Sequence, residues 1–174
     1  MRKSLSVWQT LGFIFTGILG VILHFLYEWT GENSFVAGFS AINESTWEHM
    51  KILFFPMFIF ALIENLFIGK EYKSFWCVKL VGIVLGVLSI PIIFYTVRGV
   101  FGTTPDFINI AIFYVAAFIS YFAETKLLKN GSFDCENAGI AFLLLCCIAL
   151  VFVLFTFDPP SIPIFQDPTK KGLM

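Results

Sequence analysis

Charged residues are scarce in this chain: Asp, Glu, Lys and Arg make up 13% of its 174 residues, while 58% are hydrophobic. Soluble domains are typically about a quarter charged and about half apolar. The surplus of apolar residues needs lipid as its solvent, which indicates an integral membrane protein. The net charge of −1 and the lack of a basic stripe argue against nucleic acid as a partner.

Metal motifs of fixed spacing are also missing. None of the four cysteines forms a CxxC pair, and the two histidines form no HExxH motif. Cys146 and Cys147 are adjacent in an apolar segment, where cysteine commonly behaves as a small hydrophobic residue. We interpret these two residues, together with Cys77 and Cys135, as structural. We expect neither a disulfide framework nor a cysteine-bound metal.

Long apolar segments, in contrast, are plentiful. A helix needs about 20 apolar residues to cross a bilayer, and five segments have that length. They cover approximately residues 8–28, 50–69, 75–97, 106–128 and 137–157. The links between the last four are short, which favours up-and-down packing. The sequence therefore predicts an all-α fold, a polytopic membrane helical bundle of five transmembrane helices that forms a single integral membrane domain over residues 1–174.

The basic residues indicate how this bundle is oriented. One side of the predicted bundle carries Arg2, Lys3, Lys70, Lys73, Lys126 and Lys129. The positive-inside rule places that side in the cytoplasm. We therefore expect a multi-pass protein of the cell membrane with a cytoplasmic N-terminus and an outside C-terminus. The proline-rich tail, residues 158–174, then lies outside, either as an ordered strap over the bundle or as a lid over a site.

The link between the first two spans has an unusual composition. Residues 28–51 read EWTGENSFVAGFSAINESTWEHMK and contain four glutamates and a histidine, with no basic residue before Lys51. Residues 34–42 are mostly apolar but too few to cross the bilayer. We predict that they form an interfacial or re-entrant segment after the first transmembrane helix.

A candidate site lies where this link meets the first span. His24 and Glu28 are four residues apart and share one helix face, and the link supplies Glu44 and His49. We predict that the four converge in an outer cavity and bind a divalent metal such as Zn, Mn or Fe. Glu44 and His49 are then the candidate catalytic residues. The alternative is that His24 is a hydrogen-bonded bundle residue and Glu28 a solvated residue at a helix end.

Other polar residues have structural explanations. Ser45 and Glu48 fit the spacing of a capping box at the start of the second span. Glu64 lies within an apolar helix, where an unpaired carboxylate is costly. We predict an ion pair between Glu64 and Lys79, with Glu124 at a similar depth. A proton or cation relay through these intramembrane residues is the alternative.

Three motifs resemble those of a known family. They are H-x-x-Y-E-W from His24, N-E-S-x-W-E-H-x-K from Asn43, and P-P-x-x-P-x-F-x-D-P from Pro159. Together they resemble an uncharacterised family of small bacterial integral membrane proteins that has no assigned activity. The resemblance covers most of the chain and implies a class of protein without a mechanism.

Three functions therefore stay open at the level of the sequence. The first is a metal-dependent membrane enzyme, a hydrolase that acts on a lipid or a lipid-linked substrate. The second is a small transporter or transporter subunit that uses intramembrane glutamates to couple protons or cations. The third is a non-catalytic membrane partner protein. We expect the lipid bilayer to surround the protein. We expect its substrate to be a lipid or another small molecule.

Overall fold

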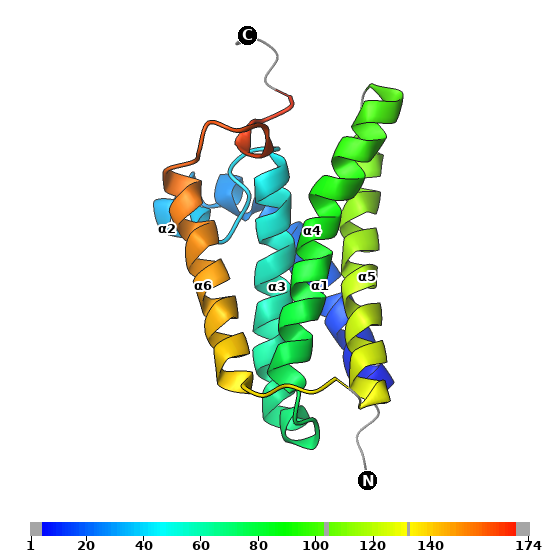
Figure 1. Cartoon of the computed structure of the whole chain (residues 1–174). Helices are drawn as coiled ribbons and strands as arrows, with labels where there is room; N and C mark the ends of the chain where they lie inside the picture. Colours follow the sequence, from blue (N-terminus) through cyan, green and yellow to red (C-terminus); the bar gives the residue numbers. More distant parts are fainter. Residues whose placement is uncertain (1–4, 103–104, 132, 170–174) are drawn as a thin grey trace.

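A computed structural model describes residues 5–102, 105–131 and 133–169 of the chain. The helices are α1 (Leu5–Trp29), α2 (Ser34–Ala37), α3 (Thr46–Phe67), α4 (Phe75–Phe101), α5 (Asp106–Asn130) and α6 (Ala138–Phe157), with short 3-10 turns η1 (Gly69–Glu71) and η2 (Pro163–Phe165). All except α2 and the two turns are long and apolar enough to cross a membrane, which confirms the predicted helical membrane bundle with five candidate spans. Figure 1 shows α3, α4, α5 and α6 packed side by side in roughly one direction, with α1 crossing obliquely behind them.

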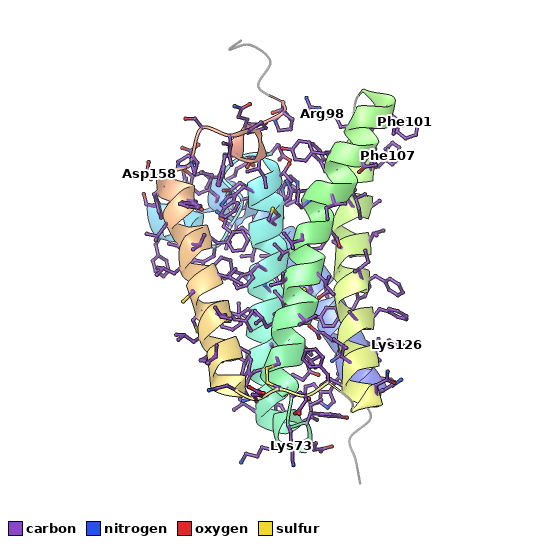
Figure 2. The ribbon with its side chains drawn as sticks, in the orientation of Figure 1. Lys73, Arg98, Phe101, Phe107, Lys126 and Asp158 are labelled. Atoms are coloured by element: carbon purple, nitrogen blue, oxygen red, sulfur yellow. A yellow bond between two sulfur atoms is a disulfide. The ribbon has the colours of Figure 1, made fainter. Side chains whose placement is uncertain are left out.

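The two ends of the bundle differ in charge and in what they carry. We call the end drawn at the top of Figure 1, with the C-terminal tail and the α4–α5 link, the upper end, and the opposite one the lower end. Figure 2 shows Lys73 and Lys126 at the lower end, and Arg98 and Asp158 at the upper end.

Helix α3 is the centre of the bundle. Every residue from Met50 to Met57 is buried, and α3 packs against α1, α4 and α6. The surrounding helices expose large apolar side chains on their outer faces, for example Ile18 on α1 and Leu143 on α6. Such a surface is the one that lipid chains solvate, whereas soluble monomers rarely expose apolar patches of this extent.

Small residues bring α4 and α5 into close contact. The Ser120 hydroxyl on α5 donates a hydrogen bond of 2.5 Å to the backbone carbonyl of Gly82 on α4. A Cβ atom added to Gly86 would come within 2.9 Å of the Ser120 Cβ. Backbone approach of this kind is the recognised use of small residues in membrane helices, where lipid supplies no hydrophobic force between helices.

The first link is folded around a buried ion pair. Nζ of Lys51 lies 2.6 Å from Oε2 of Glu48 on α3, and the two side chains are 0% and 3% exposed, respectively. The Lys51 ammonium also donates to the carbonyl of Ala37 and to the Thr156 hydroxyl, both at 2.8 Å. Glu48 accepts a hydrogen bond from the backbone N–H of Ile42. The link therefore adopts a fixed path between α1 and α3, with α2 as its short predicted segment.

The predicted capping box forms only in part. Ser45 is the N-cap of α3, and its hydroxyl accepts the backbone N–H of Glu48. Glu48 does not return the bond, because its carboxylate pairs with Lys51, and the backbone N–H of Ser45 bonds to the Asn43 side chain instead. A buried ammonium is a stronger partner for a carboxylate than a backbone amide, which explains the difference.

Our expectation about the cysteines was wrong for one pair. Cys77, near the start of α4, forms a disulfide with Cys135 in the α5–α6 link, 58 residues later in the chain. The bundle brings these two positions together at the lower end. The spacing of residues around either cysteine does not predict this pairing. Cys146 and Cys147 are free thiols in α6.

The described part of the C-terminal tail lies across the upper end as a strap (Figure 1). The ring of Phe165 in η2 lies 4.5 Å, between ring centres, from the tilted ring of Trp47 on α3 and 5.8 Å, edge-on, from that of Phe155 on α6. Because these rings anchor it, the tail continues back towards the centre of the upper end, where Pro168 and Thr169 line a cavity.

Candidate metal centre at the upper end

Two imidazoles and one carboxylate meet at the upper end. Nε2 of His24 lies 3.6 Å from Oε1 of Glu44, and Nε2 of His49 lies 3.6 Å from Oε2 of the same carboxylate. One potential ligand atom from each residue lies within 4.8 Å of the other two. We call His24, Glu44 and His49 the upper triad.

His24 reaches the triad from α1. Gly20, one turn earlier, lets α1 lie directly against the Phe113 ring of α5. The backbone N–H of Ala41 bonds to the carbonyl of Leu23 at 3.1 Å, which ties the returning link to α1 beside the histidine. The His24 side chain is 26% exposed, and its Nδ1 is buried with no hydrogen-bond partner among the described residues.

Glu44 comes from the link and depends on its folded path. The ion pair of Lys51 and Glu48 fixes the link after Glu44, and Asn43 fixes the turn by accepting the backbone N–H of Ser45 at 2.8 Å. The carboxylate is about half-exposed, with one oxygen directed to each imidazole. A carboxylate in this position bridges α1 and α3.

The backbone carbonyl of the α3 cap residue selects one tautomer of the neutral His49 ring. Nδ1 of His49 lies 2.9 Å from the backbone carbonyl oxygen of Ser45. A carbonyl oxygen only accepts hydrogen bonds, so Nδ1 carries the proton. The Nε2 of a neutral ring then holds a lone pair and faces Glu44. Histidines that bind metals are commonly oriented in this way, by an N–H bond from the other ring nitrogen to a carbonyl or carboxylate.

The electrostatics of the triad favour an ionised carboxylate. The polar contact with the His24 ring has the largest effect on the pKa of the Glu44 carboxyl and lowers it from its ordinary value. Partial burial opposes this shift, and the nearby His49 adds to it. Asp167 of the C-terminal tail is close enough to act in the opposite direction, by repulsion between carboxylates.

Glu28 does not join the triad. Its position on α1 is exposed, and it is not among the groups whose ligand atoms converge. It acts on His24 only as a nearby negative charge. Of the four residues that the sequence nominated as metal ligands, the structure brings three together and leaves Glu28 beside them at the end of the helix.

Two cavities border the triad. The larger has a volume of about 720 Å³ and extends from His24, Glu44 and His49 to Arg98 on α4 and Asn109 on α5. The smaller, of about 20 Å³, lies beside Glu44, His49 and Asn109. One water needs about 10–15 Å³ on the same measure and two or more polar partners, so the smaller recess fits a single water.

Three residues near the triad were not nominated from the sequence. Asn109 borders both cavities, and its Oδ1 is buried with no hydrogen-bond partner among the described residues. Arg98 lines the larger cavity, and Asp167 approaches from the tail. Asn109 lies on the polar side of its helix, a signal that could have found it. The order of the predicted spans places Arg98 and Asp167 at the same end of the bundle as His24, but it does not bring them into one cavity.

The second polar cluster lies deep in the bundle towards the lower end. Lys79 pairs with both Glu64 and Glu124, and the distance to Glu124 is 2.5 Å. The amide of Gln9 on α1 donates to Glu64 at 2.8 Å. The two carboxylates are fully buried, and the Lys79 side chain is 2% exposed. The predicted pair of Glu64 and Lys79 is therefore present, extended by Glu124 into a three-residue cluster that is separate from the upper triad.

Comparison with known proteins identifies the family without an activity. The chain belongs to DUF6512, a family of unknown function, whose profile matches residues 1–172. This agrees with the resemblance to an uncharacterised family. No curated protein and no solved structure matches the chain.

Proposed function

We propose that this member of DUF6512 binds a divalent transition metal in the upper triad. One observation carries the proposal: the lone pair of His49 Nε2 and an ionised Glu44 oxygen face each other at 3.6 Å. When the His49 ring is neutral, both atoms are acceptors, and they repel unless a cation lies between them. A metal ion bound by both removes the repulsion, and the Nε2 of His24 supplies a third ligand.

The spacing of the ligand atoms suits a small ion. A tetrahedral ion with bonds of about 2.0–2.2 Å holds its ligand atoms about 3.3–3.6 Å apart. Each imidazole Nε2 lies 3.6 Å from a different oxygen of Glu44, at the upper end of this range, and one ligand atom from each of the three residues lies within 4.8 Å of the others. Imidazole and carboxylate together suit Zn, Mn and Fe. Three protein ligands leave one position open, the arrangement that is typical of catalytic rather than structural sites.

The function that follows best is hydrolysis of a lipid or lipid-linked ester at the membrane boundary. Such an ion lowers the pKa of a bound water, which makes it a nucleophile near neutral pH. Hydrolysis adds the oxygen of one water to the carbonyl carbon or phosphorus of the ester, breaks the bond to the leaving oxygen and transfers a proton to it. Glu44 can ligate through one oxygen and accept the water's proton through the other, and His49 keeps the ligand geometry fixed.

The test is elemental analysis of the full chain purified in detergent with a tag that contains no histidine. We expect about one Zn, Mn or Fe per chain in the wild type and loss of this metal in a His24→Ala, His49→Ala double variant. Glu28→Gln is the matched control, because Glu28 is a neighbouring carboxylate outside the triad, and it should keep the metal. Absence of metal from the wild type, or equal metal in the double variant, would refute the site.

Activity is tested separately. The metal-loaded protein is incubated with phospholipids in mixed micelles, and the products are identified by mass spectrometry. We expect release of an alcohol or a fatty acid by the wild type and none by the double variant. Turnover that persists in the double variant, or that is missing in a fully metal-loaded wild type across phospholipid classes, contradicts the assignment as a hydrolase.

Transport is the second candidate, favoured by the charges of the lower cluster. Two carboxylates and one ammonium enclosed together leave one negative charge, which a single proton neutralises. A site of this kind is suited to carry a proton across the bilayer. We expect proton flux in liposomes to stop in Glu124→Gln if the protein is a transporter. Equal flux in wild type, variant and empty liposomes argues against this function.

A further inference from the structure

The larger cavity at the upper end combines two kinds of lining. Its polar wall holds the upper triad, Arg98 and Asn109. Its apolar wall includes Val21 and Phe25 of α1, and Ile110 and Phe113 of α5. Apolar walls with a few polar groups at one end are typical of sites for amphipathic ligands.

The apolar wall continues to the outside of the bundle. Val21, Phe25 and Ile110 are 46%, 42% and 59% exposed, so these cavity-lining residues are also part of the surface that lipid covers. Helix α1 starts beside the lower end of α5 and runs obliquely behind the bundle towards the upper end of α3 (Figure 1). The two helices are in direct contact where Gly17 lies against Tyr114 and where Gly20 lies against Phe113. The exposed side chains of Val21, Phe25 and Ile110 therefore place one side of the cavity at the lipid-facing surface of α1 and α5.

Arg98 gives the polar end a preference for anions. It lies in the last turn of α4 and borders the cavity. Its guanidinium lies 6.0 Å from the centre of the Phe94 ring, and among the described side chains no carboxylate forms an ion pair with it. Figure 2 shows Arg98 at the upper end, at the top of the bundle. A guanidinium at the edge of a half-apolar cavity presents a planar set of donors that matches a phosphate.

We infer that this cavity binds a phosphate-bearing lipid, with the phosphate between Arg98 and the upper triad and the acyl chains leaving at the lipid-facing surface of α1 and α5. The Asn109 side chain faces the same space and can hydrogen-bond the headgroup. This inference deepens the proposed function, on which its metal-dependent part rests, and it names the substrate class as phospholipids or lipid phosphates. Glu44 and Asp167 repel an anion, so the bound ion supplies the balancing positive charge.

The experiment measures binding by calorimetry in a neutral detergent with the full chain. The ligands are a short-chain phosphatidic acid, a diacylglycerol with the same chains, and inorganic phosphate, each with and without Zn²⁺. We expect the phosphatidic acid to bind wild-type protein about tenfold more tightly than the diacylglycerol, because hydrogen bonds to charged groups are strong. Zn²⁺ should tighten phosphatidic acid binding further.

Two variants address the two ends of the ligand. Arg98→Gln should weaken phosphatidic acid binding about tenfold, while Lys73→Gln, a basic residue at the lower end, should leave it unchanged. Val21→Trp should block the lipid-facing side of the cavity and weaken lipid binding but leave Zn²⁺ binding intact. Ile18→Trp is its matched control, because Ile18 is 60% exposed on the same helix and does not line the cavity.

The outcomes separate the lipid site from the metal site. Equal affinity for phosphatidic acid and diacylglycerol, or wild-type affinity in both Arg98→Gln and Val21→Trp, overturns the lipid inference even if metal binds. Inorganic phosphate that binds as tightly as phosphatidic acid overturns it in favour of a simple anion site. Binding that depends on Arg98 and Val21 in a protein without stoichiometric metal supports the lipid site and refutes the metal.

Discussion

The backbone carbonyl of Ser45 fixes which nitrogen of His49 is available as a ligand. The 2.9 Å contact with Nδ1 leaves Nε2 directed at Glu44. The cap residue of α3 thus contributes to the site through its main chain, while its hydroxyl stabilises the helix. The carbonyl of Ser45 therefore acts on the site, and its hydroxyl acts on the stability of the helix.

The first prediction concerns the pH dependence of metal affinity. Both imidazoles must be neutral to ligate, so the affinity should fall as the pH drops through the imidazole range, and it should fall by about a hundredfold per pH unit once both free rings are protonated. The pKa of Glu44 is lowered, mainly by His24. Its carboxylate therefore stays ionised as the pH falls through this range and adds nothing to the slope, and its own loss comes only at more acidic pH. Competition with a chelating dye measures the affinity.

Variants separate these contributions. His49→Ala should reduce the slope to about tenfold per unit, because one imidazole remains. Glu44→Gln should weaken binding at every pH with the slope unchanged. An affinity that does not change between pH 7.5 and 5.5 would contradict ligation by imidazole.

The second prediction concerns the hydroxyl of Ser45. Ser45→Ala removes the bond to the Glu48 N–H and should destabilise the protein by about 1 kcal/mol. Metal binding should be unchanged, because the carbonyl remains. Thermal unfolding in detergent measures the first effect and elemental analysis the second. Ser74→Ala is the matched control, since Ser74 is the N-cap of α4 and makes no side-chain capping bond. Lost metal at unchanged stability would show that the hydroxyl serves the site.

The bundle and the site could be predicted to different extents, for physical reasons. Segment length and hydropathy predict the membrane helices because few other structures satisfy the backbone in lipid. A buried carboxylate needs a partner, which is why the pair of Glu64 and Lys79 could be anticipated. Helix periodicity places His24 on the bundle face, but it places Glu28 there too. The helix ends at Trp29, so Glu28 is already exposed at its edge.

The features that the sequence could not predict depend on tertiary contacts. Arg98, Asn109 and Asp167 belong to α4, α5 and the tail, and only the packing of the bundle brings them near the triad. Lys51 lies in the first turns of a helix that follows a polar link, yet it is fully buried beneath that link. The pairing of Cys77 with Cys135 likewise results from the fold.

The third prediction concerns the lower cluster. Lys79→Met leaves two fully buried carboxylates without a counter-charge and should destabilise the protein by about 3–5 kcal/mol. Glu124→Gln removes the surplus negative charge and should cost clearly less. Lys73→Met, an exposed residue near the start of the same helix, should have little effect. Denaturant unfolding in mixed micelles measures all three. If Glu124→Gln costs as much as Lys79→Met, the cluster is not short of positive charge.

The fourth prediction joins orientation to the disulfide. We propose that the lower end, with its lysines, faces the cytoplasm, where thiols are kept reduced. Single cysteines at Ser74 and Ser161, in a background without native cysteine, should therefore differ in intact cells: an impermeant thiol reagent should label the second and spare the first. In the native chain, rapid alkylation should find Cys77 and Cys135 reduced in cells and bonded only after purification. Labelling at Ser74 together with an oxidised native pair would reverse the orientation and place the upper triad in the cytoplasm.

The fifth prediction concerns the contact between α4 and α5. In Gly86→Ala the new methyl group meets the Ser120 Cβ at 2.9 Å and the Ala116 carbonyl at 3.2 Å. Neither atom is the far end of a flexible side chain, so the helices must separate, at a cost of about 1–3 kcal/mol. Gly99→Ala is the matched control on the same helix, where an added Cβ meets nothing within 4 Å. Alanine stabilises a helix interior relative to glycine by about 0.5–1 kcal/mol, so this control should be neutral or slightly more stable. Thermal unfolding of the two variants in one detergent gives the comparison. Equal stability of both would mean that α4 and α5 do not rely on close backbone approach.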